Sequence, residues 1–181
     1  MSPPRYSTPA IALHWLSAVL VIGMIGWGMW MADLPKGAER SWAFGIHKSF
    51  GLLAIALIAT RVVWRLGHRP PENPALHGIE RTVATAAHHI LYVLLVLVPA
   101  AGLTSVSFTK YPLKFFGIPV PKPGYPDEAL NAFFSGAHTA LAWTLAALIV
   151  LHVAAAIRHW LRRDGTMERM LPGRSGPERD N

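Results

Sequence analysis

The amino-acid sequence predicts an all-α integral membrane protein built as a four-transmembrane-helix bundle. Of its 181 residues, 52% are hydrophobic and only 15% are charged, a composition too apolar for an ordinary soluble domain. Four apolar segments are long enough to cross the ~30 Å hydrocarbon core of a bilayer as helices. They cover about residues 10–31, 44–66, 84–107 and 132–160.

The first two segments have recognisable ends. The first could be a signal peptide, but its apolar run of about twenty residues contains His14 and several tryptophans, and no small-residue cleavage site stands out. We therefore expect a retained helix that ends near Pro35. The second helix should end before Pro70-Pro71, because proline lacks the backbone donor and restricts the residue before it.

The third segment contains Pro99 with Gly102 nearby, which predicts a kink. The connection that follows, about 108–131, holds five prolines. We expect it to form an ordered cap on the outer side, since proline leaves few backbone donors to satisfy. Residues 1–172 should form one transmembrane domain, and the polar tail 173–181 should be disordered.

The basic residues indicate how the bundle lies in the membrane. A net charge of +7 would suggest nucleic-acid binding in a soluble protein, but here Lys and Arg cluster at the helix ends, so we expect no nucleic-acid partner. Eleven of them flank the side that holds both termini, and six flank the other side. The positive-inside rule therefore predicts a multi-pass protein with both termini cytoplasmic. The absence of cysteine excludes thiolate haem ligation, cysteine-ligated iron–sulfur clusters and disulfides.

Four histidines lie inside the apolar segments, where an imidazole is by default a functional hypothesis. His138 and His152 are fourteen residues apart in the fourth segment, so they lie within about 40° of one helix face and ~21 Å apart along the axis. Because successive helices run in opposite directions, His14 shares the cytoplasmic depth of His152, and His47 shares the outer depth of His138. A single buried histidine is better interpreted as a hydrogen-bonded interior residue, whereas four at matched depths predict two bis-histidine sites.

These pairs suit haem better than zinc. Haem iron takes four nitrogens from its macrocycle and leaves two axial positions, while structural zinc requires four protein ligands and neither pair has a Cys, Asp or Glu nearby. Helix bundles are a frequent setting for such cofactors. The sequence therefore predicts a bundle enclosing two haems, with four iron ligands: His14, His152, His47 and His138.

Three further histidines are secondary candidates. His88 and His89 begin the third helix on the cytoplasmic side, and either could replace an inner ligand or contact a propionate or quinone. His159 lies ~10 Å beyond His152 toward the cytoplasm. It could couple protons to electron transfer or bind quinone, or it could be a plain interfacial residue.

Haem propionates need cationic partners. Arg61 and Arg65 end the second helix on the inner side, one turn apart, and could hold the inner propionates. They could equally be anchors that follow the positive-inside rule. Lys48 follows His47 directly and could serve the outer haem.

The motifs that carry these residues resemble those of the bacterial cytochrome b561 family. They are ALHWLSAVL, GIHKSFGLL, AHHILYVLLVLVPAAG and GAHTALAWTLAALIVLHVAAAIRHW with the trailing RRDGTMERMLP, and together they span about residues 5–172. The resemblance implies a cytochrome b domain of the bacterial inner (plasma) membrane with two b-type haems. It also implies that the four histidines above are the axial ligands. The family includes superoxide oxidases, which oxidise superoxide at the periplasmic face and reduce ubiquinone.

The first functional hypothesis is thus a dihaem cytochrome that moves electrons across the inner membrane as a superoxide:ubiquinone oxidoreductase. A locally positive outer surface would steer superoxide, a small anion, to the outer haem. Alternatively, the outer lysines only solvate a loop and oppose Asp127 and Glu128. The lysines concerned are Lys48, Lys110, Lys114 and Lys122.

The second hypothesis is a haem-bearing electron-transfer subunit that serves a periplasmic dehydrogenase or another redox partner. Apolar residues of the outer connection would then form the docking patch, although they could equally pack against the bundle or dip into the lipid headgroups. They are Tyr111, Phe115, Phe116 and Ile118. A third hypothesis is a metal transporter with a histidine relay. No motif marks the quinone site.

Overall fold

The computed structural model describes residues 4–172, so the expected disordered tail lies outside the described residues. The fold is the predicted all-α bundle, and each of its four long helices is long and apolar enough to cross a membrane. The helices are α1 (Thr8–Asp33), α2 (Ala38–Gly67), α3 (Gly78–Ser107) and α4 (Glu128–Arg162).

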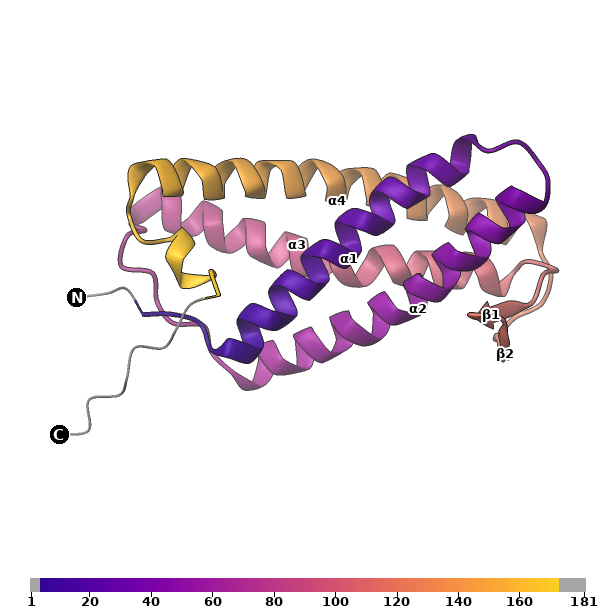
Figure 1. Ribbon diagram of the computed structural model, residues 1–181, viewed down its shortest axis with the longest axis horizontal. Helices are drawn as coiled ribbons and strands as arrows, with labels where there is room; N and C mark the ends of the chain where they lie inside the picture. The colour runs from indigo at the N-terminus through magenta and orange to yellow at the C-terminus, as the bar shows by residue number, and fades with distance from the viewer. Residues whose placement is uncertain (1–3, 173–181) are drawn as a thin grey trace.

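The helices associate as two pairs. α1 packs mainly on α2, and α3 packs mainly on α4, whereas α1 meets α4 over a small area (Figure 1). A cluster of buried apolar residues fills the middle of the bundle: Val21, Ala54, Ile58, Leu94, Leu95 and Leu145. Large apolar side chains also cover the outside, where Val19, Val63 and Val150 are 67–71% exposed. Such a surface suits contact with lipid, which imposes no penalty on apolar groups.

The helix ends follow the prolines as expected. α1 ends at Asp33, two residues before Pro35, and α2 ends at Gly67, before Pro70. Pro99 lies inside α3, which continues to Ser107, so this proline does not end its helix.

The connection between α3 and α4 contains a short antiparallel hairpin of β1 (Leu113–Phe115) and β2 (Ile118–Val120). Its two turn residues, Phe116 and Gly117, have φ of 45° and 92°, the positive values that a type I′ turn requires. The sequence predicted an ordered cap there but no strands. Each strand has three residues, and Pro119 is the central residue of β2, so neither run is long enough to show the alternation that identifies a strand.

The opposite end of the bundle is held together by Arg169, at the end of the short helix η1 (Met167–Arg169). This side chain is buried, and its guanidinium donates to the carbonyl oxygens of Pro4, Pro71 and Glu72. The segment before α1, the α2–α3 connection and the segment after α4 therefore meet at one end.

Candidate functional site

The outer pair of histidines faces across the bundle from two helices. The ring centroids of His47 on α2 and His138 on α4 are 6.1 Å apart, with the ring planes at 82°. Two imidazoles bonded at about 2 Å to opposite sides of one metal ion would have centroids about 6 Å apart. The separation therefore fits axial ligation of one haem iron by both rings.

The hydrogen bonding of these rings also fits. The Nδ1 atom of His138 lies 2.8 Å from the carbonyl oxygen of Val98. A carbonyl only accepts, so Nδ1 carries the proton and Nε2 keeps its lone pair for a metal. Among the described residues, the buried Nδ1 of His47 has no hydrogen-bond partner. A buried polar atom without a hydrogen-bond partner requires an explanation. A cofactor bound beside the His47 ring would explain it.

Two glycines let neighbouring helices approach the outer rings. A Cβ atom at Gly102 of α3 would lie 3.0 Å from Nδ1 of His138, and one at Gly28 of α1 would lie 3.5 Å from Cε1 of His47. The sequence marks Gly102 only by its place near Pro99 and identifies neither glycine as a site residue. Nothing in their spacing from the histidines reveals the contact, because each glycine lies on a different helix from the ring it meets.

The inner site gathers three imidazoles. The ring centroids of His14 on α1 and His152 on α4 are 6.3 Å apart, with the planes at 61°, and the His88 ring lies 5.4 Å from that of His152. His89 does not join them. Its Nδ1 lies 2.8 Å from the carbonyl oxygen of Thr85, and it lines a shallow surface pocket with Arg81.

Arg61 lies inside this cluster. Its Nη2 is 3.0 Å from Nδ1 of His14. Because a guanidinium only donates, Nδ1 accepts and the neutral His14 ring carries its proton on Nε2. Binding a metal through Nε2 would therefore require Arg61 to release His14, and the outer pair fits a haem more directly than the inner pair. The guanidinium also lies over the Tyr92 ring at 5.1 Å.

The other two candidate propionate partners also lie on α2, one near each histidine level. Arg65 is half-buried one turn after Arg61, and Lys48 is half-buried directly after His47. Within residues 4–172, no group of three or more His, Asp or Glu side chains could hold a metal ion. The donor set of two facing imidazoles thus suits axial ligation better than a zinc site.

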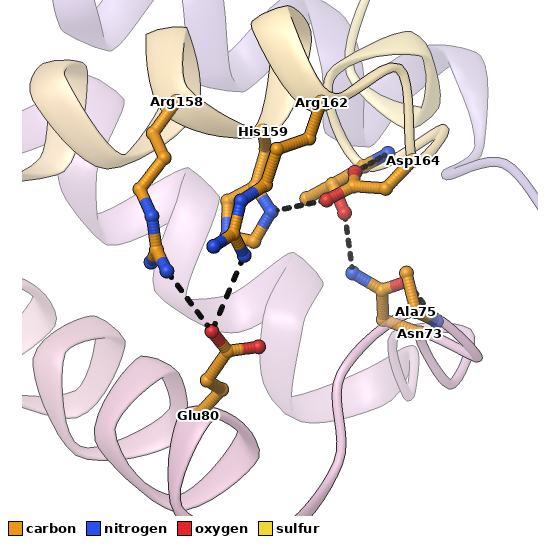
Figure 2. A network of polar contacts seen from close by, with 8 residues as sticks. Asn73, Ala75, Glu80, Arg158, His159, Arg162 and Asp164 are labelled. Carbon is orange, nitrogen blue, oxygen red and sulfur yellow. Dashed lines mark hydrogen bonds and ion pairs between the residues drawn. The ribbon is translucent and has the colours of Figure 1, made fainter.

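His159 belongs to a polar network at the end of α4 rather than to the inner cluster (Figure 2). Its Nδ1 lies 2.5 Å from Oδ2 of Asp164. The other carboxylate oxygen accepts from the Thr166 amide at 3.0 Å, and Asn73 donates to the Thr166 hydroxyl at 3.1 Å. Burial raises the pKa of Asp164, but the hydrogen bonds from His159 and Thr166 outweigh it and hold that pKa below its ordinary value. No sequence pattern identified Asp164 as the partner of His159.

Ionic contacts are distributed unequally between the two ends. In the described part of the chain every ion pair lies at the η1 end, including those from Arg158 and Arg162 to Glu80 at 3.2 and 3.5 Å. At the other end, Asp127 accepts from the Leu130 amide at 2.9 Å and caps α4. None of the lysines at that end is in an ion pair within residues 4–172.

Sequence similarity to known proteins assigns the chain to a family. Residues 5–173 match the family described as prokaryotic cytochrome b561. Cytochrome b561 homolog 2 of Escherichia coli (strain K12) is 36% identical over 177 residues, which cover 94% of this chain and 93% of that protein. The probable superoxide oxidase CybB of Yersinia pestis is 29% identical, covering 95% and 98%. Cytochrome b561 homolog 1 of E. coli (strain K12) is 24% identical, covering 94% and 98%. The chain therefore belongs to the prokaryotic cytochrome b561 family and is a multi-pass membrane cytochrome of the haem b type.

Proposed function

We propose that the chain binds two b-type haems, one between His47 and His138 and one between His14 and His152. The observation that carries this proposal is the pair of imidazole–imidazole separations, 6.1 and 6.3 Å, at two levels of α4 that are ~21 Å apart. Bound haem would supply one-electron transfer between the two faces of the membrane. The protein holds the iron ligands on rigid helices at a fixed spacing.

Cationic side chains are assigned to the haem propionates. Lys48 follows His47 of the outer pair in sequence, Arg61 contacts His14 of the inner pair, and Arg65 follows Arg61 one turn later on α2. Arg61 would turn from Nδ1 of His14 to the inner propionate, because a charged acceptor binds a guanidinium more strongly than a neutral imidazole does. This movement also frees His14 for ligation.

We place the end with η1 and both termini in the cytoplasm, and the hairpin end in the periplasm. The excess of Lys and Arg near the η1 end supports this orientation. Superoxide is then the proposed donor at the periplasmic end. A relative with 29% identity is named a probable superoxide oxidase, and lysines without ion pairs would give a positive field that steers a small anion.

The proposed reaction balances without covalent catalysis. Each superoxide loses one electron and becomes dioxygen, and two such electrons with two protons convert one ubiquinone to ubiquinol at the cytoplasmic end. Lys48, Lys110 and Lys114 attract the donor. His159 and Asp164, joined at 2.5 Å, would relay protons to the quinone, because a hydrogen-bonded imidazole and carboxylate can hand a proton from one to the other.

The first test is a reduced-minus-oxidised optical spectrum of the purified protein with haem quantitation, followed by addition of superoxide and then ubiquinone. We expect two haems per chain, rapid reduction by superoxide and reoxidation by ubiquinone. Haems that respond only to quinol or to a periplasmic partner protein would contradict the superoxide proposal and favour an electron-transfer subunit.

Histidine variants test the ligand assignment separately. His138→Ala and His152→Ala should each lose one haem, since each removes an axial ligand of a different site. His88→Ala is the matched control, because it removes an imidazole 5.4 Å from His152 and should keep both haems. Loss of the inner haem in His88→Ala with retention in His14→Ala would overturn the inner pairing.

A further inference from the structure

The hairpin 113–120 lies against the side of the bundle at the end away from η1 (Figure 1). The Phe116 ring at its turn meets the Phe50 ring of α2, with centroids 5.4 Å apart. The Phe116 amide donates to the Ser49 hydroxyl at 2.9 Å, and Leu113 is buried. The hairpin is therefore fixed to α2, and its turn lies at the level of Phe50.

Phe50 lies deeper in the membrane than the tryptophans at the same end of the bundle. Trp27 contacts both Trp30 and Trp42, with centroids 4.8 and 5.7 Å apart, and Trp30 and Trp42 are exposed. Exposed tryptophans at helix ends mark the membrane–water interface. Phe50 follows Trp42 by eight residues of α2, which is ~12 Å along the helix axis toward the bilayer centre. The turn of the hairpin thus lies at hydrocarbon depth.

Backbone at that depth must have its polar groups satisfied within the protein. The Ser49 hydroxyl accepts from the Phe116 amide at 2.9 Å. Its Oγ, which carries the proton, lies 2.9 Å from the Gly45 carbonyl oxygen, four residues earlier, and 3.4 Å from the Lys114 carbonyl oxygen. Phe115 of β1 and Ile118 of β2 are the pair that closes the two-residue turn, so Lys114 and Pro119 form the next pair of the ladder. The alternation of an antiparallel ladder then points the nitrogen of Pro119 away from β1. Proline has no N–H, so the outer edge of β2 offers no unpaired donor at that position.

The exposed side chains of the hairpin suit lipid. Phe116 and Ile118 are 49% and 67% exposed, and Phe116 holds a positive φ that is strained for a bulky residue. Nearer the interface, the ammonium of Lys110 lies over the Tyr111 ring at 5.7 Å. Lys114 has a stem long enough for its charge to reach the headgroups.

We propose that the β1–β2 hairpin is inserted in the outer leaflet, with Phe116 and Ile118 against acyl chains and Lys110 and Lys114 at the membrane–water interface. The exposed patch is continuous with the lipid-facing side of α2 at Phe50, which favours lipid over a periplasmic protein as the occupant. The inference does not depend on which donor or acceptor the haems use. If the hairpin is inserted, Phe116 and Ile118 are covered by lipid and do not form a docking surface for a periplasmic protein.

Spin-label depth measurements test the proposal, because the natural chain has no cysteine. A label on Ile118→Cys, in phospholipid bilayers, should collide with dissolved oxygen and be hidden from a water-soluble nickel chelate. Val150→Cys on the exposed face of α4 is the lipid control, and Lys36→Cys in the α1–α2 connection is the water control. We expect chelate accessibility at Ile118 to fall to the level of Val150. Accessibility like that of Lys36 would overturn the proposal, as would protection from both reagents, which would mean that protein covers the patch.

A second measurement uses the unaltered chain. A lipid-soluble carbene reagent, activated in the same bilayers, should modify peptides that contain residues 115–118 as well as the exposed face of α2. Modification of α2 at Leu53 without modification of the hairpin would overturn the proposal, whatever the labelled variants show.

Discussion

At the scale of single residues, the absence of a side chain at Gly102 matters as much as the presence of the histidines. The His138 ring occupies the space that a Cβ atom at this position would enter, at 3.0 Å from Nδ1. The same ring atom lies 2.8 Å from the Val98 carbonyl oxygen. A shift of the ring would therefore change both the hydrogen bond that fixes its tautomer and the direction of Nε2.

Gly102→Ala should lower the haem content of the outer site. The added methyl group forces either the His138 ring or α3 to move by a few tenths of an ångström, which weakens axial ligation. Haem quantitation per chain measures the effect. Gly136→Ala is the matched control, since a Cβ atom there meets nothing within 4 Å. Two haems with unchanged spectra in Gly102→Ala would contradict this prediction.

Asp164→Asn should destabilise the protein near neutral pH and much less in acid. The pKa of Asp164 is held below its ordinary value of 3.8 in the folded chain. The stabilisation is therefore fully present above that value and is lost as the pH falls through the lowered pKa. Thermal midpoints of both proteins across the acid range measure the difference. Glu168→Gln, at an exposed position of η1, should show no such pH dependence.

The sequence paired the four histidines by depth because depth follows from helix direction alone, and the rings of the two pairs lie 6.1 and 6.3 Å apart. Their role as haem ligands stays a prediction. It could not predict the partner of His159, because that contact depends on the turn after α4, where Arg163 and Gly165 have φ of 53° and 82°. Those two residues reverse the chain and return Asp164 to the imidazole. Neither did it predict that Arg61 contacts His14, since that contact depends on how α1 and α2 pack.

At the scale of elements, the long helices were predictable and the hairpin was not. Apolar length and proline positions identified four spans, and the end of α1 lies two residues from the proline that marked it. The hairpin depends on a tertiary contact instead. Ser49 is buried on α2 and bonds the Phe116 amide from 67 residues away in sequence, a pairing that no local pattern reveals.

Ser49→Ala should loosen the hairpin without disturbing α2. The Phe116 amide would lose the hydroxyl that accepts its hydrogen bond. Leaving a buried donor unsatisfied costs about 1–3 kcal/mol of stability. Hydrogen exchange over residues 113–120 should accelerate, while exchange in α2 stays the same. Ser41→Ala is the control, because Ser41 also bonds the carbonyl four residues earlier, at 2.9 Å from Gly37, but is exposed. Equal exchange in the two variants would contradict the prediction.

At the scale of the whole molecule, Arg169 joins three segments that are far apart in sequence. Its guanidinium satisfies carbonyl oxygens of Pro4, Pro71 and Glu72 and lies over the Tyr6 ring at 5.3 Å. The side chain is 4% exposed, so these contacts exchange little with water. They close the η1 end of the bundle.

Arg169→Met should lower the free energy of unfolding by about 2–4 kcal/mol, because several buried carbonyl groups lose their donor together. The thermal midpoint in detergent measures the change. Arg158→Met is the control. Its ion pair with Glu80 is solvent-exposed, and such pairs contribute less than about 1 kcal/mol. Similar losses in both variants would contradict the prediction that the buried hydrogen bonds of Arg169 stabilise the η1 end.

The division of the bundle into two helix pairs also bears on how the protein is made and turned over. Each proposed haem bridges the α1–α2 pair to α4, where direct helix–helix contact is small. A ligand that binds only the assembled state adds its binding free energy to stability. Haem supply would then set how many newly inserted chains survive proteolysis, so the abundance of this cytochrome should follow the haem content of the cell even at constant synthesis.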